Sequence, residues 1–157
     1  MKLFNKFPDN SRLWLYQSNR MLTPSEIKEI NNQIEGFVQK WAAHGNKLWA
    51  DAAILNPYFI AFVVDDALTP PSGCSIDASV HFLKELGKQF NIDFFTRTKV
   101  CLLNEDNKID QIDFDKLKEL NLKGNELLFD PLISNLKDLR EEWPLEINKS
   151  SFAMVLS

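Results

Sequence analysis

The chain has 157 residues and a net charge of −4, with a hydrophobic content of 45%. This length is enough for one well-packed core, so we expect a single domain over residues 1–157, and the acidic balance argues against nucleic acid as a partner. The two cysteines, Cys74 and Cys101, provide neither a disulfide framework nor the spacing of a zinc site. We find no signal peptide and no apolar run long enough to cross a membrane, so we expect a cytoplasmic protein without metal or cofactor.

The first predicted elements are a strand and a helix. Residues 12–19 alternate and are rich in Trp, Tyr and Leu, which is typical of a strand. A helix should follow, because Thr23 is a good N-cap, Pro24 fits the first helical position and Glu26 completes a capping box. Gly45 is its natural end. The apolar stripe of this helix is Ile27, Ile30, Ile34, Phe37, Val38 and Trp41.

Two strands are then predicted at residues 47–55 and 58–65. Asn56-Pro57 between them is a turn signal, so these strands should pair as a hairpin. After the loop that contains Pro70-Pro71, a second helix and a fourth strand at residues 97–103 are expected. The buried stripe predicted for the second helix is Ile76, Val80, Leu83, Gly87 and Phe90.

These elements follow the order β-α-β-β-α-β between residues 12 and 104. That order is the ferredoxin-like arrangement, in which an antiparallel sheet carries two helices on one face. Helical spacing recurs at residues 114–122 and 132–143, with a short strand at 126–129 between them. We therefore predict an α+β fold with a ferredoxin-like core and a helical C-terminal extension over about residues 105–157.

The predicted sheet is apolar on both of its faces. Residues 59–64 of the third strand, Phe-Ile-Ala-Phe-Val-Val, are all apolar, so both alternating sets of side chains avoid water. The two helices can cover only one face, and the other face needs a different cover. We expect the C-terminal extension in that place first, a second copy of the chain in a homodimer next, and an apolar ligand last.

The segment Ser72-Gly73-Cys74-Ser75-Ile76-Asp77 lies where the second helix is expected to begin, with Ser75 as N-cap. A helix N-terminus lowers the pKa of a thiol, so Cys74 is a weak candidate for a catalytic or redox thiolate, with Asp77 and His81 nearby. The competing interpretation is a plain helix N-terminus, in which Asp77 complements the helix dipole and His81 is solvated. We favour this second interpretation.

The free N–H groups of the same segment also form a candidate anion site. Basic residues elsewhere in the chain would supply positive charge to it. The segment lacks the spaced glycines of dinucleotide-binding loops, so it predicts no particular anion. The candidate residues of this site are Gly73, Cys74, Ser75, Arg20, Lys84 and Arg97.

A resemblance to a known family rests on three stretches: WLYQSNR at residues 14–20, WAAHG at 41–45, and GCSID at 73–77 with Ser79-Val80 after it. Together they resemble a small bacterial family often labelled "ABC transporter ATPase", most clearly over residues 14–98. The resemblance carries over no catalytic residue. An ATPase of that class needs a Gly-x-x-x-x-Gly-Lys-Ser/Thr loop, and none of the five glycines opens one, so we do not expect ATPase activity.

Our leading hypothesis is a non-catalytic binding or interaction module that self-associates through apolar sheet surface, with no small-molecule ligand identified. The alternative is a small-molecule enzyme or thiol-redox protein that uses Cys74. On the first strand, Trp14, Tyr16 and Arg20 are further candidates for a binding surface, because aromatic rings beside an arginine suit stacking and anion contacts.

Overall fold

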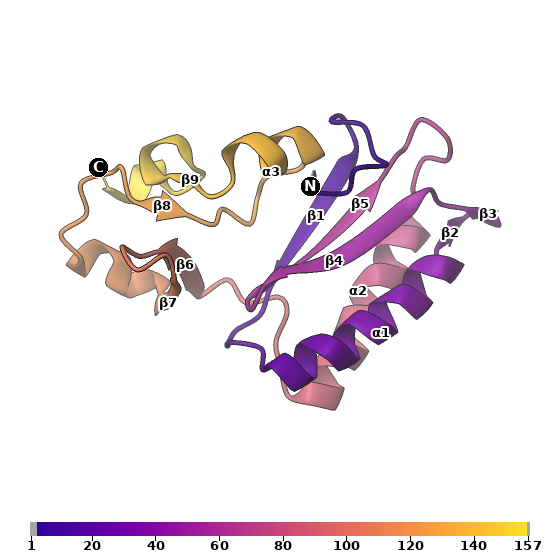
Figure 1. Ribbon diagram of the computed structural model, residues 1–157, viewed down its shortest axis with the longest axis horizontal. Helices are drawn as coiled ribbons and strands as arrows, with labels where there is room; N and C mark the ends of the chain where they lie inside the picture. The colour runs from indigo at the N-terminus through magenta and orange to yellow at the C-terminus, as the bar shows by residue number, and fades with distance from the viewer. Residues whose placement is uncertain (1–2, 157) are drawn as a thin grey trace.

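The computed structural model describes residues 3–156 and has the predicted α+β class. The chain forms two main antiparallel sheets, whose strands are labelled in Figure 1. The first sheet carries two long helices on one of its faces, and the C-terminal half of the chain, built around the second sheet, lies on its other side.

The first sheet has the strand order β1-β5-β4, and each neighbouring pair is antiparallel. The predicted hairpin is confirmed, and Asn56 stabilises its turn by accepting the Tyr58 N–H at 2.9 Å. Every residue of β5 is buried, which explains its unbroken apolar sequence. The strands of this sheet are β1 (Arg12–Gln17), β4 (Ala50–Asn56) and β5 (Phe59–Val64).

Helix α1 (Pro24–Lys40) begins with the predicted capping box, in which Thr23 accepts the Glu26 N–H and Glu26 accepts the Thr23 N–H. The helix ends before Gly45, which lies instead in the turn of a small hairpin. Gly45 has a φ of +80° there, a conformation that two-residue hairpin turns require. The strands of this hairpin are β2 (Ala42–Ala43) and β3 (Asn46–Lys47).

Helix α2 (Gly73–Phe90) has Ser72 as its N-cap, and Ser75 completes a capping box rather than capping the helix itself. The predicted stripe is right at Leu83 and Gly87, right in part at Phe90, which packs half-buried against the core, and wrong at the partly exposed Ile76 and Val80. Serines face the core because each hydroxyl donates to a carbonyl of its own turn, which leaves no buried donor unpaired. The buried residues of α2 are Ser75, Ser79, Leu83, Leu86 and Gly87.

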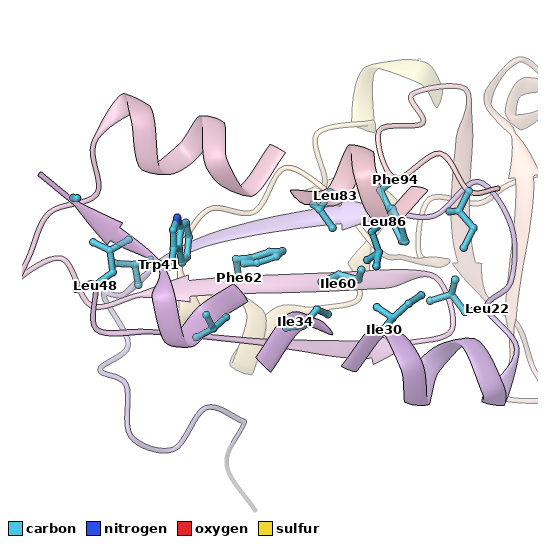
Figure 2. Close-up of a cluster of buried hydrophobic side chains, with 14 residues drawn as sticks. Leu22, Ile30, Ile34, Trp41, Leu48, Ile60, Phe62, Leu83, Leu86 and Phe94 are labelled. Carbon is cyan, nitrogen blue, oxygen red and sulfur yellow. The ribbon is translucent and has the colours of Figure 1, made fainter. Parts of the chain in front are cut away.

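The main core lies between these two helices and the first sheet, as Figure 2 shows. Trp41, just after α1, is buried with its ring centroid 5.7 Å from that of Phe62, and its indole N–H donates to the Ser75 carbonyl at 2.7 Å. This bond fixes the beginning of α2 against the end of α1. Among the most deeply buried members are Ile30, Ile34, Ile60, Phe62 and Leu83.

The predicted fourth strand exists as β6 (Lys99–Leu103), but it belongs to the second sheet, whose order is β7-β6-β8-β9. The ferredoxin-like sheet order is therefore not confirmed. Asn107 has a φ of 62° and turns the chain directly back, so β7 and then β8 occupy the two edges of β6. The other strands of this sheet are β7 (Ile109–Asp113), β8 (Leu127–Leu128) and β9 (Leu145–Glu146).

The C-terminal extension is mixed rather than helical. The predicted strand at residues 126–129 is confirmed as β8, and the predicted helix at 132–143 is confirmed in part as α3 (Leu136–Glu142). The two isoleucines of β7, Ile109 and Ile112, lie three residues apart and pack against different hydrophobic clusters, and the strand pairs along the whole of β6. Three short 3-10 helices complete the extension: η1 (Phe114–Glu119), η2 (Ile147–Lys149) and η3 (Ala153–Leu156).

The second face of the first sheet is covered by the chain itself, as expected for the extension. Arg140 of α3, whose side chain is 6% exposed, donates to the carbonyls of Phe4 and Phe7 at 2.6 and 3.0 Å and holds the N-terminal segment there. The homodimer stays a prediction, now without the open apolar face that motivated it. The covering side chains include Phe4, Phe7, Cys101, Phe129, Leu136 and Leu139.

Candidate functional site

The sequence-predicted thiol site lies on the first turns of α2. Cys74, Asp77 and His81 are exposed there, and within residues 3–156 their side chains form no hydrogen bond. Two of the N–H groups proposed to bind an anion are occupied: the Ser75 N–H donates to the Ser72 hydroxyl at 3.1 Å, and the Ile76 N–H donates to the Ser72 carbonyl at 3.0 Å. This turn therefore works as a helix cap.

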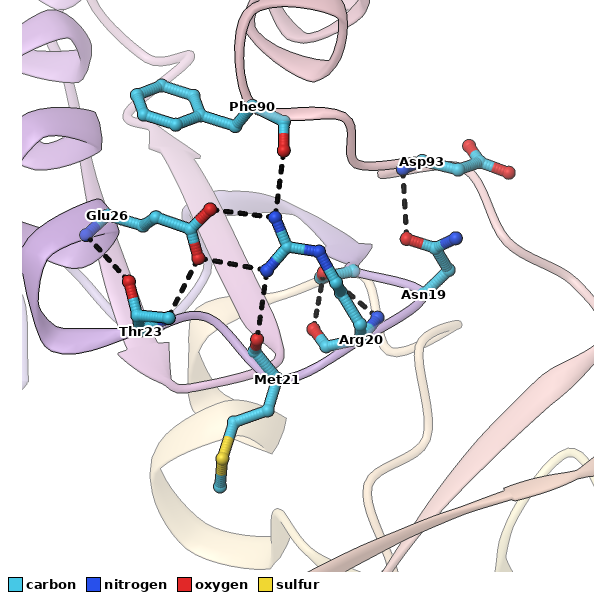
Figure 3. Close-up of polar contacts among 8 residues, drawn as sticks. Asn19, Arg20, Met21, Thr23, Glu26, Phe90 and Asp93 are labelled. Carbon is cyan, nitrogen blue, oxygen red and sulfur yellow. Dashed lines mark hydrogen bonds and ion pairs between the residues drawn. The ribbon is translucent and has the colours of Figure 1, made fainter.

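Arg20 lies at the other end of α2 and clamps three elements together (Figure 3). Its guanidinium donates to both carboxylate oxygens of Glu26, at 2.9 and 2.7 Å, and to the carbonyls of Met21 and Phe90, at 3.2 and 2.8 Å. The hydrogen bonds from Arg20, followed by the one from the Thr23 N–H, lower the pKa of Glu26 to about 2. The clamp joins the end of β1 to α1 and α2.

The structure does not bring Arg20 to the candidate anion site. A helix rises about 1.5 Å per residue, so Phe90 is roughly 24 Å along α2 from Cys74. Arg97, on the loop after α2, is exposed and lines a different feature, a groove that includes neither Gly73 nor Ser75. The residues predicted for an anion site are thus spread over separate parts of the surface.

That groove follows the outer edge of β1. It consists of two adjoining hollows of about 440 and 250 Å³, which share Leu15, Tyr16, Pro131 and Leu132 in their linings. One wall is aromatic, with the rings of Tyr16 and Phe95 in edge-to-face contact at 5.6 Å. The other wall is the loop after β8, where Leu132 is 70% exposed. The groove is therefore largely apolar and open to solvent.

Three of the residues singled out from the sequence line this groove: Trp14, Tyr16 and Arg97. Sequence reasoning missed Phe95 and Leu132. Both come from loops whose course depends on how the second sheet packs against the first, and neither lies in a recognisable motif. The alternating aromatic residues of β1 were the one local sequence signal that pointed to the groove.

The edge of β1 inside the groove has no strand beside it. Leu13 donates its N–H to the Ser134 carbonyl at 3.0 Å, on the side away from β5. In an antiparallel strand alternate residues point their main-chain groups the same way, so Leu15 also directs its N–H and C=O outward. No residue in the described range 3–156 pairs with them, because the bridges outside the ladder lie at the two ends of β1, at Arg12 and Gln17.

This edge stays open for a local reason. Pro131 has no N–H, and the N–H of Leu132 is bonded to the Asp130 carboxylate at 2.9 Å, so neither residue donates to β1. At the other end of the groove, the Phe95 N–H is bonded to the Asp93 carboxylate at 2.8 Å. The two loops thus satisfy these N–H groups internally and donate neither of them to the middle of β1.

Three basic residues line the groove: Arg12, Arg97 and Lys99. No acidic residue of the described chain lines it, although the whole chain has a net charge of −4. Lys99 is paired with Asp113. Neither arginine forms a salt bridge within residues 3–156, and Arg12 lies 4.8 Å from the centre of the Trp14 ring. The lining of the groove therefore carries positive charge, in contrast to the chain as a whole.

The side chains that line the groove are aromatic, aliphatic, basic and neutral polar. No His, Cys or carboxylate of the described chain lines it. Burial raises the pKa of Tyr16, an effect that a hydrogen bond with Ser79 partly opposes, so the phenol is protonated at neutral pH.

Within residues 3–156, neither the second cysteine nor a group of metal-ligating side chains provides a further candidate site. Cys101 is buried, and burial raises the pKa of its thiol to about 12, which suppresses the thiolate. Within residues 3–156, no three His, Cys, Asp or Glu side chains are grouped so that they could hold a metal ion. In the same range, none of the helices is long and apolar enough to span a membrane.

Comparisons with protein-family models, with curated proteins and with solved structures find no match. The resemblance seen in the sequence stays a prediction.

Proposed function

We propose that this chain is a non-catalytic binding module whose ligand site is the groove along β1. The observation that carries this proposal is the coincidence of three features in one groove. These are the unpaired main-chain groups of Leu15, the aromatic wall of Tyr16 and Phe95, and the guanidinium groups of Arg12 and Arg97. Such groups bind ligands through hydrogen bonds, ring contacts and charge, without a covalent step.

Amide chemical shifts of the ¹⁵N-labelled protein test this proposal. The protein is screened against small aromatic carboxylates and against short peptides, each added in excess. We expect shift changes that cluster at Leu15, Phe95 and Leu132 and that persist in the Cys74→Ser variant. Changes that cluster at residues 73–77, or no change at any groove residue, would refute the proposal.

Thiol chemistry at Cys74 is the competing function, and the observation in its favour is the exposure of this thiol on the first turn of α2. The pH dependence of Cys74 alkylation, measured in the Cys101→Ser variant, tests this competing function. A rate that titrates well below the free-thiol value of about 8.5 supports a reactive thiolate. A rate that titrates at the ordinary value removes the support for this alternative.

A further inference from the structure

We propose that the occupant of the groove is a short acidic segment of another protein, bound in an extended conformation as an added strand on β1. This inference rests on the proposed function, because it names the ligand class of the same groove. It follows from three properties of the groove: its main-chain groups, its length and its charge.

The main-chain groups match a peptide. The outward groups in the groove are the Leu13 C=O, the Leu15 N–H and the Leu15 C=O, in line along one strand edge. An extended peptide presents acceptors and donors at the same spacing, which is why peptides add to open sheet edges. Leu15 as a whole residue is 9% exposed, and a partner at this edge would complete the hydrogen bonding of its main-chain groups.

The length of the open edge limits the segment. Strand residues rise about 3.3 Å, so the interval from Leu13 to Gln17 is about 13 Å and accommodates about four extended residues. Beyond it, Ser134 pairs with β1 at one end and Phe95 bridges to Gln17 at the other. A long strand does not fit, and a short linear segment does.

The side-chain surroundings define the chemistry of the segment. An added strand would direct alternate side chains to opposite sides of the sheet, and the groove offers aromatic rings at Trp14 and Tyr16 and an aliphatic surface at Leu132. Arg12 stands at the first residue of β1, and Arg97 lines the hollow that contains Gln17, the last one. Apolar residues flanked by aspartate or glutamate therefore complement this groove best.

Selection from a library of random hexapeptides displayed on phage tests the inference on the full chain. We expect enriched peptides to carry acidic residues beside apolar ones. A synthetic enriched peptide, followed by fluorescence anisotropy, should bind at least tenfold more weakly to Arg97→Glu. It should bind within twofold of wild type to the control Lys47→Glu, which makes the same charge change at an exposed position of β3. Backbone N-methylation is tested at each of two adjacent central residues of the peptide, and at the one whose N–H faces β1 it should also weaken binding at least tenfold.

Several results would overturn the inference. Enriched peptides that are basic, or binding that is unaffected by N-methylation at both adjacent positions, would show that the edge of β1 is not the recognised feature. No enrichment would exclude a peptide, while groove shifts with small carboxylates would leave the binding-module proposal standing. Concentration-dependent self-association abolished by Arg97→Glu would identify the occupant as a second copy of this chain.

Discussion

Arg20 shows why a residue suited to ligand binding has to be judged by its partners. In the sequence it stands beside aromatic residues and is a natural candidate for anion contacts. In the structure four hydrogen bonds to Glu26, Met21 and Phe90 engage its guanidinium, so its charge supports the packing of two helices. Arg97 has no such partners within residues 3–156, and this difference separates a structural arginine from a candidate binding residue.

The Glu26→Gln variant tests the Arg20 clamp. The folded protein holds the pKa of Glu26 at about 2, below its unfolded value, so ionised Glu26 stabilises the fold at neutral pH. We expect the variant to lose about 1–2 kcal/mol of unfolding free energy at pH 7. The difference should shrink as the pH falls from about 4.5 toward about 2, where Glu26 becomes protonated. Urea titrations at several pH values measure this difference in unfolding free energy between wild type and variant. A difference that does not depend on pH would contradict the proposed role of ionised Glu26 in the clamp.

At the scale of elements, Gly87 near the end of α2 permits a close approach to the chain that follows. A Cβ at this position would lie 2.4 Å from the carbonyl oxygen of Ile92, which is main chain and cannot easily move. We expect Gly87→Ala to lower the unfolding free energy by about 2 kcal/mol or more. Gly36 of α1 is the matched control, since a Cβ there meets nothing within 4 Å.

Gly36→Ala should raise the unfolding free energy by about 0.5–1 kcal/mol, because alanine favours the helix. Thermal or urea unfolding of both variants compares them directly. Equal effects of the two substitutions would mean that the turn after α2 adapts to a side chain.

Elements with local signals were predictable from the sequence. The capping box at Thr23 and Glu26 and the hairpin turn at Asn56 involve residues only a few positions apart, and both are confirmed. The first half of the α2 stripe is wrong because Ser75 and Ser79 satisfy their own hydroxyls and can be buried, which hydrophobicity alone does not reveal.

Elements that depend on competition between distant partners were not predictable. The strand β6 was predicted, but its partners were not, since pairing with β1 or with β7 satisfies the same main-chain groups and only tertiary packing decides between them. The groove is hard to predict from the sequence for the same reason. Its strand residues Trp14 and Tyr16 were candidates from the sequence, whereas the wall at Leu132 depends on where the C-terminal half docks.

At the scale of the whole molecule, the two sheets share one core. Phe59 of β5 lies with its ring centroid 5.1 Å from that of Trp143, in the C-terminal half. Polar bonds join the same parts, since Gln111 of β7 donates to the Ser18 carbonyl at 2.7 Å. We therefore expect the chain to unfold as one cooperative unit, in keeping with the single domain predicted from its length.

The Leu136→Ala variant tests whether the two sheets unfold cooperatively. Leu136 of α3 is fully buried on the second face of the first sheet, so its truncation should lower the unfolding free energy by about 2–5 kcal/mol. Amide signals of Ile60 in the first sheet and Leu102 in the second should then disappear at the same lower urea concentration. The control Leu68→Ala, at a residue 68% exposed, should have little effect. Separate transitions for the two sheets would show that each folds alone.

The most direct test of the account is hydrogen exchange at the amide of Leu15. In the free protein this N–H has no partner within the described chain, whereas Trp14 and Tyr16 lie in the ladder with β5, so the Leu15 amide should exchange faster than both by about tenfold or more. Addition of an enriched acidic hexapeptide should slow it to the level of its neighbours. A Leu15 amide already protected in the free protein, or one whose exchange the bound peptide leaves unchanged, would contradict the proposal that β1 offers an open edge for a partner strand.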